Sequence, residues 1–386
     1  MPQILPFAGY RFDLDMVASL DAVTSPPYDV ISDEEQQHYR ALSPWNVVRL
    51  ECNDKHLDAE SRAARYTESA TSLQTWISEG SLRQDERSFY PYEMEFALDG
   101  QRRTVRGLIC SVGVEPWGGS IVPHEHVMSR LVDERLGLMH QTRANFSPIY
   151  AVCSNPADPL GEVLSGLGEP ESTVVDEEGT THRLWRLPDP SIPDLLSGDD
   201  LLIADGHHRY TVALAYREAM RAAHGPGPWD EVMMFVVDAA VQDLPVLPIH
   251  RLLRSPAPLA GPAVEHLSAA IDSADDDVPS VGLIGPGPAY STIRLSGGPP
   301  AVSALHDGPL AGMEGGRELV FTPDATEADR SVREGEAAMA VLLPPTTAER
   351  IRSVIDGGRR MPQKSTFFWP KPRTGMVLRV MPEPAP

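Results

Sequence analysis

The chain has 386 residues, of which 41% are hydrophobic and 23% are charged, and its formal net charge is −22 at pH 7. This composition is typical of a globular protein with two or three compact units and excludes wholesale disorder. A nucleic-acid binder usually neutralises phosphates with clustered Lys and Arg, and no such cluster stands out in this acidic sequence. Broad nucleic-acid binding is therefore disfavoured.

The sequence favours a cytoplasmic protein. Its best apolar run, "VMMFVV", stops at Asp238 and is far too short to span a membrane. The amino terminus lacks the basic start and long apolar segment of a secretory signal. Cys52, Cys110 and Cys153 lie far apart without CxxC spacing, which indicates reduced thiols and no disulfide framework or zinc knuckle.

Residues 1–115 are expected to form an α/β extension. The proline-constrained turn "SPPYDVIS" (25–32) precedes a predicted helix that Ser32 begins as N-cap. Apolar residues at three- and four-residue intervals then predict an amphipathic helix that ends at Gly80. They are Ala63, Tyr66, Ala70, Leu73 and Ile77. Alternation and β-branched content predict strands over 88–98 and 103–114.

The remaining chain is expected to divide into three segments, which makes the predicted fold class mixed α+β. Residues 116–254 form the predicted core: a loop feeds a helix within 120–145, and short strands follow at 147–154, 181–187, 199–205 and 231–241. Residues 255–316 are rich in Pro, Gly and Ala and read as an insertion or linker. Residues 317–386 are predicted to be an α/β segment, with a strand and then a helix begun by Thr347.

The stretch "LLIADGHHRYTVALAYREAM" (201–220) is predicted to be a buried strand, a tight turn at Asp205 and Gly206, and a helix starting near His207 or His208. The N–H groups of the first helical turn, reinforced by the helix dipole, attract anions. Arg209 adds a group that can bind phosphate oxygens in two places, so the turn is a candidate phosphate cradle. Alternatively, Asp205 caps the helix and the histidines bond to backbone. A metal site on both histidines is awkward, since neighbouring side chains diverge.

Two further stretches carry candidate chemistry. In "VPHEHVMSR" (122–130), Glu125 lies between histidines and could act as a general base, or could be a solvated acid at a helix start. The HExxH zinc motif is excluded because position 128 is methionine. In "MPQKSTFF" (361–368), the "KST" residues could hold a phosphate, although a lone KST is usually surface polar sequence; Gln363 excludes a Walker A loop. Tyr28 and Asp29 could also reach a site, but the two prolines before them more often impose a rigid turn.

The chain resembles a bacterial family catalogued as domain of unknown function 1015. Several separated segments carry the resemblance in the same order, and together they span nearly the full length. They are "SPPYDVIS", "THRLWRL", "IADGHHRYTVAL", "GEAAMAVLLPPTTAE" and "MPQKSTFFWPKPRTG".

Three of the segments also resemble the archaeal free serine kinase, a member of the ParB and sulfiredoxin-like superfamily. This resemblance implies a ParB/sulfiredoxin-like mixed-sheet core and a kinase that phosphorylates the hydroxyl of free serine or a related hydroxy amino acid, with ATP or ADP as donor and with Mg²⁺. It implies Glu125 and Asp205 as catalytic residues, the latter also as metal ligand. By the same resemblance, nucleotide and phosphate would be bound by Gly206, His207, His208, Arg209, Lys364, Ser365 and Thr366. The substrate is expected to contact His124 and Arg130, which flank Glu125, and Phe367 and Phe368, which follow Thr366.

The chain also departs from that kinase. About eighty residues separate Glu125 from Asp205, more than in the archaeal enzyme, and the first 115 or so have no counterpart there. Phe367 and Phe368 stand where the kinase carries a basic pair, so the acceptor is not fixed as serine.

Other function classes are possible. A ParB-like nucleotide switch would need a DNA-reading element that this acidic chain does not display. Sulfiredoxin-like chemistry needs a cysteine in the phosphate turn, where this chain has His207. A non-catalytic nucleotide-binding protein would keep the phosphate cradle without turnover.

Overall fold

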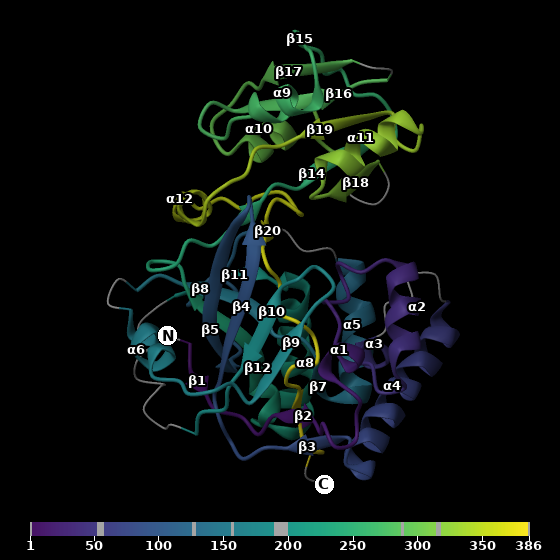
Figure 1. Ribbon diagram of the computed structural model, residues 1–386, viewed down its shortest axis with the longest axis vertical. Coiled ribbons are helices and arrows are strands. Elements are labelled where there is room, and N and C mark those ends of the chain that lie inside the picture. The colour runs from purple at the N-terminus through teal and green to yellow at the C-terminus, as the bar shows by residue number, and fades with distance from the viewer. Residues whose placement is uncertain are drawn as a thin grey trace. The chain divides into compact units, whose positions relative to one another are not determined.

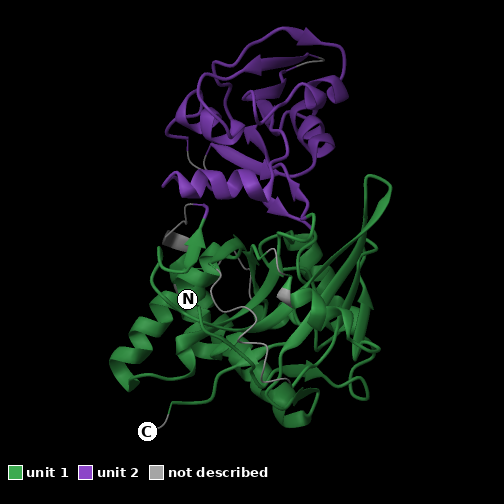
Figure 2. Cartoon of the chain, turned by 90° about the vertical axis from the view of Figure 1, so that its left-hand side faces the viewer, with its two compact units in different colours: residues 1–123, 127–243, 370–386 green, residues 124–126, 244–369 purple. Residues whose placement is uncertain are grey.

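The computed structural model describes residues 2–51, 58–125, 129–155, 158–188, 200–286, 289–313 and 318–384. The chain divides into two compact units, shown in Figure 2. Unit 1 comprises Met1–Pro123, Val127–Asp243 and Pro370–Pro386, and unit 2 comprises His124–His126 and Leu244–Trp369. The four segments suggested by the sequence are a different division of the chain, and that division stays a prediction. Three residues from the middle of the unit 1 sequence therefore belong to unit 2.

Unit 1 is built on a mixed sheet, drawn in Figure 1, which among the described residues runs β6-β11-β8-β12-β5-β4-β10-β9, with β1 also paired to β5. The pairs β6/β11 and β8/β12 are parallel, and the others are antiparallel. Its strands are β1 (Ile4–Leu5), β4 (Tyr90–Leu98), β5 (Gln101–Gly113), β6 (Ile121–Pro123), β8 (Ile149–Cys153), β9 (Ser172–Val175), β10 (Thr181–Leu184), β11 (Leu201–Asp205) and β12 (Glu231–Asp238). Two small sheets pair β2 (Tyr10–Phe12) with β3 (Leu82–Gln84) and β7 (Ala144–Asn145) with β21 (Arg379–Val380).

The central strands are apolar because both faces of this sheet are covered. Every residue of β8 is buried, and so is every residue of β12 except Glu231. In Figure 1, α2, α3, α4 and α5 lie together beside the sheet, and α5 packs against both α4 and α8. The helices are α1 (Leu20–Val23), α2 (Asp33–Leu42), α3 (Val48–Glu51), α4 (Ala59–Glu79), α5 (Ser129–Thr142), α6 (Pro159–Ser165), α8 (His207–His224) and the 3-10 turn η1 (Pro228–Asp230).

Unit 2 contains an antiparallel sheet in the order β15-β17-β16-β19-β14-β18, and β13 pairs with β20 separately. Its strands are β13 (Val246–Leu247), β14 (His250–Leu253), β15 (Ala263–Val264), β16 (Ser280–Ile284), β17 (Tyr290–Arg294), β18 (Leu319–Thr322), β19 (Met339–Leu342) and β20 (Phe367–Phe368). Its helices are α9 (Leu267–Asp272), α10 (Ala301–Asp307), α11 (Ala325–Arg333) and α12 (Ala348–Asp356). A buried cluster that includes Leu252, Ile284 and Leu342 forms its core.

The structure confirms the mixed α+β class and most of the predicted elements. Ser32 caps α2 in a capping box with Glu35, and Gly80 ends α4 in the left-handed conformation at φ 83°. Thr347 caps α12 through the Arg350 amide. In residues 255–316, expected as an insertion or linker, the described part contains three strands and two helices, each short because Pro and Gly interrupt them.

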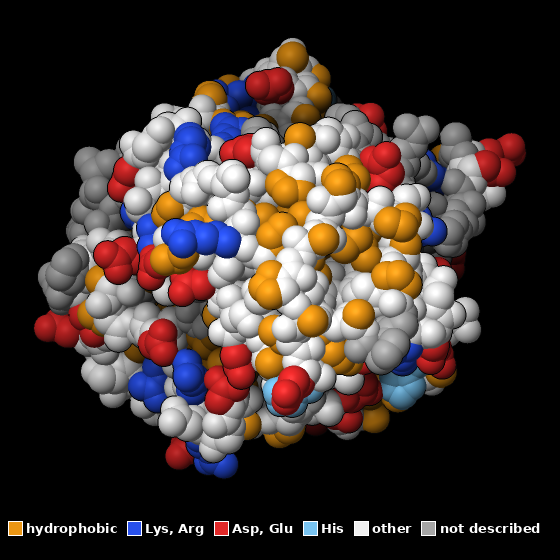
Figure 3. Space-filling model, turned by 90° about the horizontal axis from the view of Figure 1, so that it is seen from above, with side chains coloured by type: hydrophobic (Ala, Val, Ile, Leu, Met, Phe, Trp, Pro, Cys, Tyr) orange, Lys and Arg blue, Asp and Glu red, His pale blue; other side chains and the backbone are white. Residues whose placement is uncertain are grey.

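One face of the molecule shows how its surface charges are distributed. In Figure 3, hydrophobic and neutral side chains occupy the centre of this face, and acidic and basic side chains are interspersed around its edge.

Among the described residues, no helix combines the length and the hydropathy needed to cross a membrane.

Candidate functional site

In unit 1, the "DGHHR" residues form a strand-to-helix turn, as predicted. Strand β11 ends at Asp205, Gly206 is the N-cap of α8 with φ 93°, and the helix begins at His207. Gly206 is thus the N-cap residue, and the Asp205 carboxylate before it forms ion pairs with Arg209 and Lys371. The turn thus presents helix-start amides beside one carboxylate and two cations.

Glycine is required at position 206 for two reasons. A φ of 93° lies in the left-handed region, which residues with a Cβ rarely adopt. A Cβ built on Gly206 would also lie 2.9 Å from Arg209 Nε and 3.1 Å from its Cζ. The glycine therefore leaves the space that the Arg209 side chain occupies as it turns back over the helix start.

Arg209 and the two histidines extend this turn. Arg209 donates from Nη1 to the carbonyl of Pro148 at 2.5 Å in addition to its pair with Asp205. Burial alone would lower the pKa of Arg209, but the charges of Asp205 and Asp29 outweigh it and raise that pKa. His207 is buried and His208 is half-buried in the first turn of α8.

Sequence reasoning missed Lys371 and Arg373, although both lie in the segment "FWPKPRTG". Lys371 pairs with Asp205 and is only 9% exposed. Arg373 donates from Nε to Thr24 Oγ1 at 2.6 Å, which ties the segment to the residue just before "SPPYD". The sequence pattern that could have indicated these two residues is a Lys and an Arg next to prolines and a glycine, which constrain the backbone around them.

In unit 2, Glu125 meets the predicted "KST" residues, which lie 239 to 241 residues further along the chain. Its Oε2 accepts the Lys364 amide at 2.9 Å. Its Oε1 accepts the Ser365 and Thr366 amides at 2.9 and 3.1 Å and the Thr366 hydroxyl at 3.2 Å. Lys364 has φ 55°, so successive amides converge in an anion-binding nest. The nest holds the carboxylate of Glu125.

His124 belongs to the same cluster and is fully buried. Its Nε2 lies 2.7 Å from Thr366 Oγ1, and its carbonyl accepts the Met361 amide at 2.7 Å. The Phe368 ring packs edge-on against the imidazole with centroids 6.2 Å apart. Ser365 and Thr366 are 5% and 9% exposed, so the "KST" residues are not surface polar sequence.

The other predicted substrate residues differ in their surroundings. Phe368 is 1% exposed, whereas Phe367 is half-buried and stacks on Trp369 with centroids 5.8 Å apart. Arg130 lies in α5, and its side chain is outside the described part of the chain.

Arg251 is a buried cation of unit 2 that no sequence motif indicated. Its guanidinium is fully buried and donates from Nη1 to the carbonyls of Ile249 at 2.6 Å and of Lys364 at 2.8 Å. Burial lowers the pKa of Arg251 to about 9, and the charge of Glu125 opposes that shift. By holding the Lys364 carbonyl, Arg251 fixes the peptide chain whose amides bind Glu125.

The described residues do not form a magnesium site by themselves. They contain no group of three or more His, Cys, Asp or Glu side chains that could hold a metal ion. Asp205, the predicted ligand, is already paired with two cations. A magnesium ion needs oxygen ligands, and these two cations compete for that carboxylate.

The chain belongs to the family described as "Protein of unknown function (DUF1015)", whose model matches residues 4–305. No curated protein matches the chain.

Solved structures give distant likenesses. A conserved hypothetical protein from Pyrococcus furiosus is 14% identical, with a TM-score of 0.37, over 65% of this chain and 90% of that one. A free serine kinase in complex with AMP is 13% identical, with a TM-score of 0.39, over 68% and 88%. SbnI with a C-terminal truncation, from Staphylococcus aureus, is 10% identical, with a TM-score of 0.35, over 66% and 81%.

Proposed function

We propose that this protein is a nucleotide-dependent kinase that phosphorylates the hydroxyl of free serine or of a related hydroxy amino acid. The observation that carries the proposal is the binding of Glu125 by the amides of Lys364, Ser365 and Thr366, because it joins two sequence segments assigned to one reaction. The proposal includes a ParB/sulfiredoxin-like character for the mixed-sheet core and a cytoplasmic location.

The "DGHHR" turn has the chemistry needed to bind the donor nucleotide. Helix-start amides and guanidinium groups bind phosphate oxygens, and Lys371 adds a second cation at the same carboxylate. Phosphoryl transfer depends mainly on positioning and on neutralisation of the phosphate charge. In this proposal Arg209, Lys371 and the first-turn amides perform both tasks.

Glu125 is the proposed general base. Hydrogen bonds from three amides and one hydroxyl stabilise its ionised form, which is the form that accepts a proton. His124 and Arg251 are positioning residues, since they hold Thr366 and the Lys364 carbonyl. No step is assigned to Mg²⁺, which would enter with the nucleotide.

The proposal is tested by incubating the purified chain with Mg²⁺, ATP or ADP, and single hydroxy amino acids, and by detecting O-phosphorylated product with mass spectrometry. Glu125→Gln should lower the rate at least a hundredfold while nucleotide still binds, because general acid–base catalysis contributes roughly 10²–10⁴-fold. Glu349→Gln, at an exposed position of α12, is the matched control. Arg209→Ala should weaken nucleotide binding itself.

The outcomes separate the proposed kinase from the other classes. Nucleotide binding without product in any mixture would replace the kinase with a non-catalytic nucleotide-binding protein. Retention on duplex DNA at physiological salt, with nucleotide hydrolysis and no phosphorylated amino acid, would favour a ParB-like switch.

A further inference from the structure

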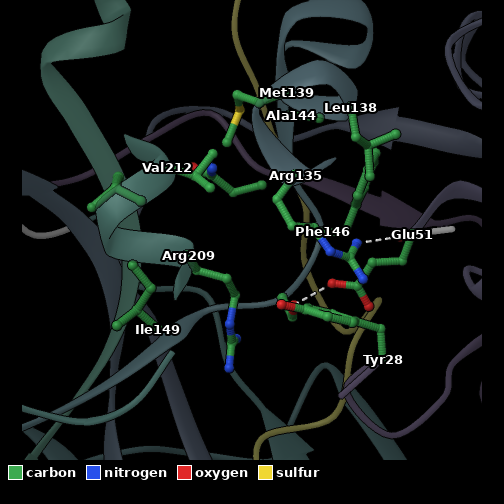
Figure 4. A pocket seen from close by; sticks show the side chains of 13 residues that line it. Tyr28, Glu51, Arg135, Leu138, Met139, Ala144, Phe146, Ile149, Arg209 and Val212 are labelled. Carbon is green, nitrogen blue, oxygen red and sulfur yellow. Dashed lines mark hydrogen bonds between the residues drawn. The ribbon is translucent and has the colours of Figure 1, made fainter. Parts of the chain in front are cut away.

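The pocket drawn in Figure 4 lies beside Arg209 of the "DGHHR" turn and measures about 50 Å³. Part of its wall comes from the extension that precedes the mixed-sheet core. Tyr28 of the "SPPYD" turn and Glu51, the last residue of α3, belong to that extension, and they line the pocket together with Arg135 of α5 and Arg209 of α8. The extension therefore reaches the surroundings of the proposed phosphate-binding turn.

Glu51 is held through both its backbone and its side chain. The Arg135 guanidinium donates to the backbone carbonyl of Glu51 and lies over the Tyr28 ring, 3.2 Å from its centroid. The Glu51 carboxylate accepts a hydrogen bond from Ser147 Oγ at 2.5 Å, and Glu51 as a whole is 5% exposed. These contacts fix the position of the carboxylate, and the carboxylate in turn anchors Ser147.

Ser147 directly precedes the residue that holds Arg209. That residue is Pro148, whose carbonyl accepts the bond from Arg209 Nη1 at 2.5 Å. Both residues lie in the short connection between β7 and β8. A proline fixes its own φ and restricts the backbone of the residue before it. Anchoring Ser147 therefore also limits where the Pro148 carbonyl can lie.

The two Nη atoms of Arg209 are bound on different sides. Nη1 donates to the Pro148 carbonyl, and Nη2 forms the ion pair with Asp205. A guanidinium bound at both atoms keeps one orientation, whereas one bound at a single atom retains rotational freedom that a ligand must then remove. The Pro148 carbonyl thus preorganises Arg209.

We propose that Glu51 is a positioning residue of the phosphate site: it anchors Ser147 and so places the Pro148 carbonyl that orients Arg209. This inference rests on the proposed binding of nucleotide phosphates at the "DGHHR" turn, and it makes the N-terminal extension a working part of that site.

The positioning depends on the hydrogen bond of Glu51 and not on its charge. The charge of Glu51 acts on Arg209, and a negative charge there opposes an incoming phosphate. Burial also raises the pKa of Glu51, so its surroundings disfavour the charged form. An uncharged acceptor of the same size should therefore hold Ser147 equally well.

The test is the affinity of the full chain for ATP and for tripolyphosphate, measured by isothermal titration calorimetry. Tripolyphosphate reports on the phosphate-binding groups alone. Glu51→Met keeps the length of the side chain and removes the acceptor, and should weaken the binding of both ligands at least about fivefold. Glu51→Gln keeps an acceptor for Ser147 Oγ and should restore most of that loss. Glu79→Met, at an exposed position of α4, is the control.

Ser147→Ala removes the same hydrogen bond from its other side and should weaken both ligands by a similar factor. Melting temperatures establish which variants are folded, and Ser147→Ala carries the test if Glu51→Met does not fold. Equal weakening in Glu51→Met and Glu51→Gln would assign the effect to charge and overturn the proposal. Wild-type affinity in a folded Ser147→Ala would overturn it as well.

The outcomes distinguish this positioning role from the proposed kinase. Wild-type affinity for ATP and tripolyphosphate in all the variants contradicts the role of Glu51 and leaves the nucleotide site intact. Failure of the wild-type chain to bind either ligand at millimolar concentrations contradicts the nucleotide site itself, and with it both proposals.

Discussion

Arg251 is fully buried in unit 2, and its guanidinium is the donor to the carbonyls of Ile249 and Lys364. Arg251→Met removes this donor and leaves both carbonyls without it, so we expect the free energy of unfolding to fall by roughly 1–3 kcal/mol. Urea denaturation measures the change, and Arg254→Met, at an exposed position beyond β14, is the control. An unchanged midpoint in Arg251→Met would mean that burying the charge costs as much as its hydrogen bonds contribute.

We expect the free energy of unfolding to fall in acid because of His250. Its Nδ1 accepts the Leu343 amide at 3.1 Å, and burial, together with the charge of Arg251, lowers the pKa of His250 to about 4. Between pH 4 and 6.5 the unfolded chain then binds more protons than the folded one. The contribution of His250 is therefore complete above pH 6.5 and is lost as the pH falls toward 4, up to about 3 kcal/mol.

The measurement is the melting temperature at pH 7.5 and at pH 5. His250→Asn keeps an acceptor for the Leu343 amide but cannot titrate, so its melting temperature should fall less than that of the wild type. His266→Asn, at an exposed position, should leave the wild-type pH dependence unchanged. His306, whose pKa burial also lowers to about 4, accounts for pH dependence that remains in His250→Asn.

For single residues, the sequence identified those that lie in recognisable motifs. It did not identify residues whose role depends on being buried next to a particular partner. Glu125 and Lys364–Thr366 were singled out from their local patterns, and the structure brings them together. Arg251 and Lys371 were missed because their roles depend on burial and on partners more than 100 residues away. Local sequence does not encode which buried carbonyl or carboxylate a cation will meet.

Helix α8 has a glycine with positive φ at each end, which gives a matched pair of substitutions. A Cβ at Gly206 would meet Arg209, whereas a Cβ at Gly225 would have nothing within 4 Å. Gly206→Ala and Gly225→Ala should each lose roughly 1 kcal/mol of stability from backbone strain. Gly206→Ala alone should also weaken nucleotide binding, measured by calorimetry, because it displaces the Arg209 side chain. Equal nucleotide affinity in both variants would contradict this role of the glycine.

Elements with a strong period or a clear cap could be predicted from the sequence. Helix α4 follows its apolar spacing and ends at Gly80, and α12 begins after Thr347, as expected. The strands and helices between 255 and 316 were not predicted individually, because runs of two to seven residues are too short to show a period. Strand β16 also pairs with β19, which lies outside that segment, so sheet pairing and not local propensity alone determines it.

At the scale of the whole molecule, separate cores predict separate unfolding transitions. Phe235 is fully buried in unit 1, and Leu342 is 1% exposed in unit 2. Phe235→Ala should destabilise unit 1 by about 3–5 kcal/mol, and Leu342→Ala should destabilise unit 2 by about 2–5 kcal/mol. Differential scanning calorimetry should show two transitions, with one lowered by each variant. A single transition that both variants lower equally would mean that the units unfold together.

The interleaved connection of the two units could not be predicted from composition. A boundary is usually recognised where many residues change character together, but here unit 2 takes only His124–His126 from the first half of the chain. His124 and Glu125 belong to unit 2 through contacts with the segment around Met361–Thr366, such as the hydrogen bond from the Met361 amide to the His124 carbonyl.

This interleaving sets an order on synthesis at the ribosome. The amides that bind Glu125 are made only after about 240 further residues have been translated. Strand β7 and Asp205 gain their partners at later codons, because Arg379–Val380 and Lys371 follow Lys364–Thr366 in the chain. Neither unit can therefore finish folding until nearly the whole chain has been translated. A message cut short before codon 370 would leave Asp205 without Lys371 and β7 without its partner strand.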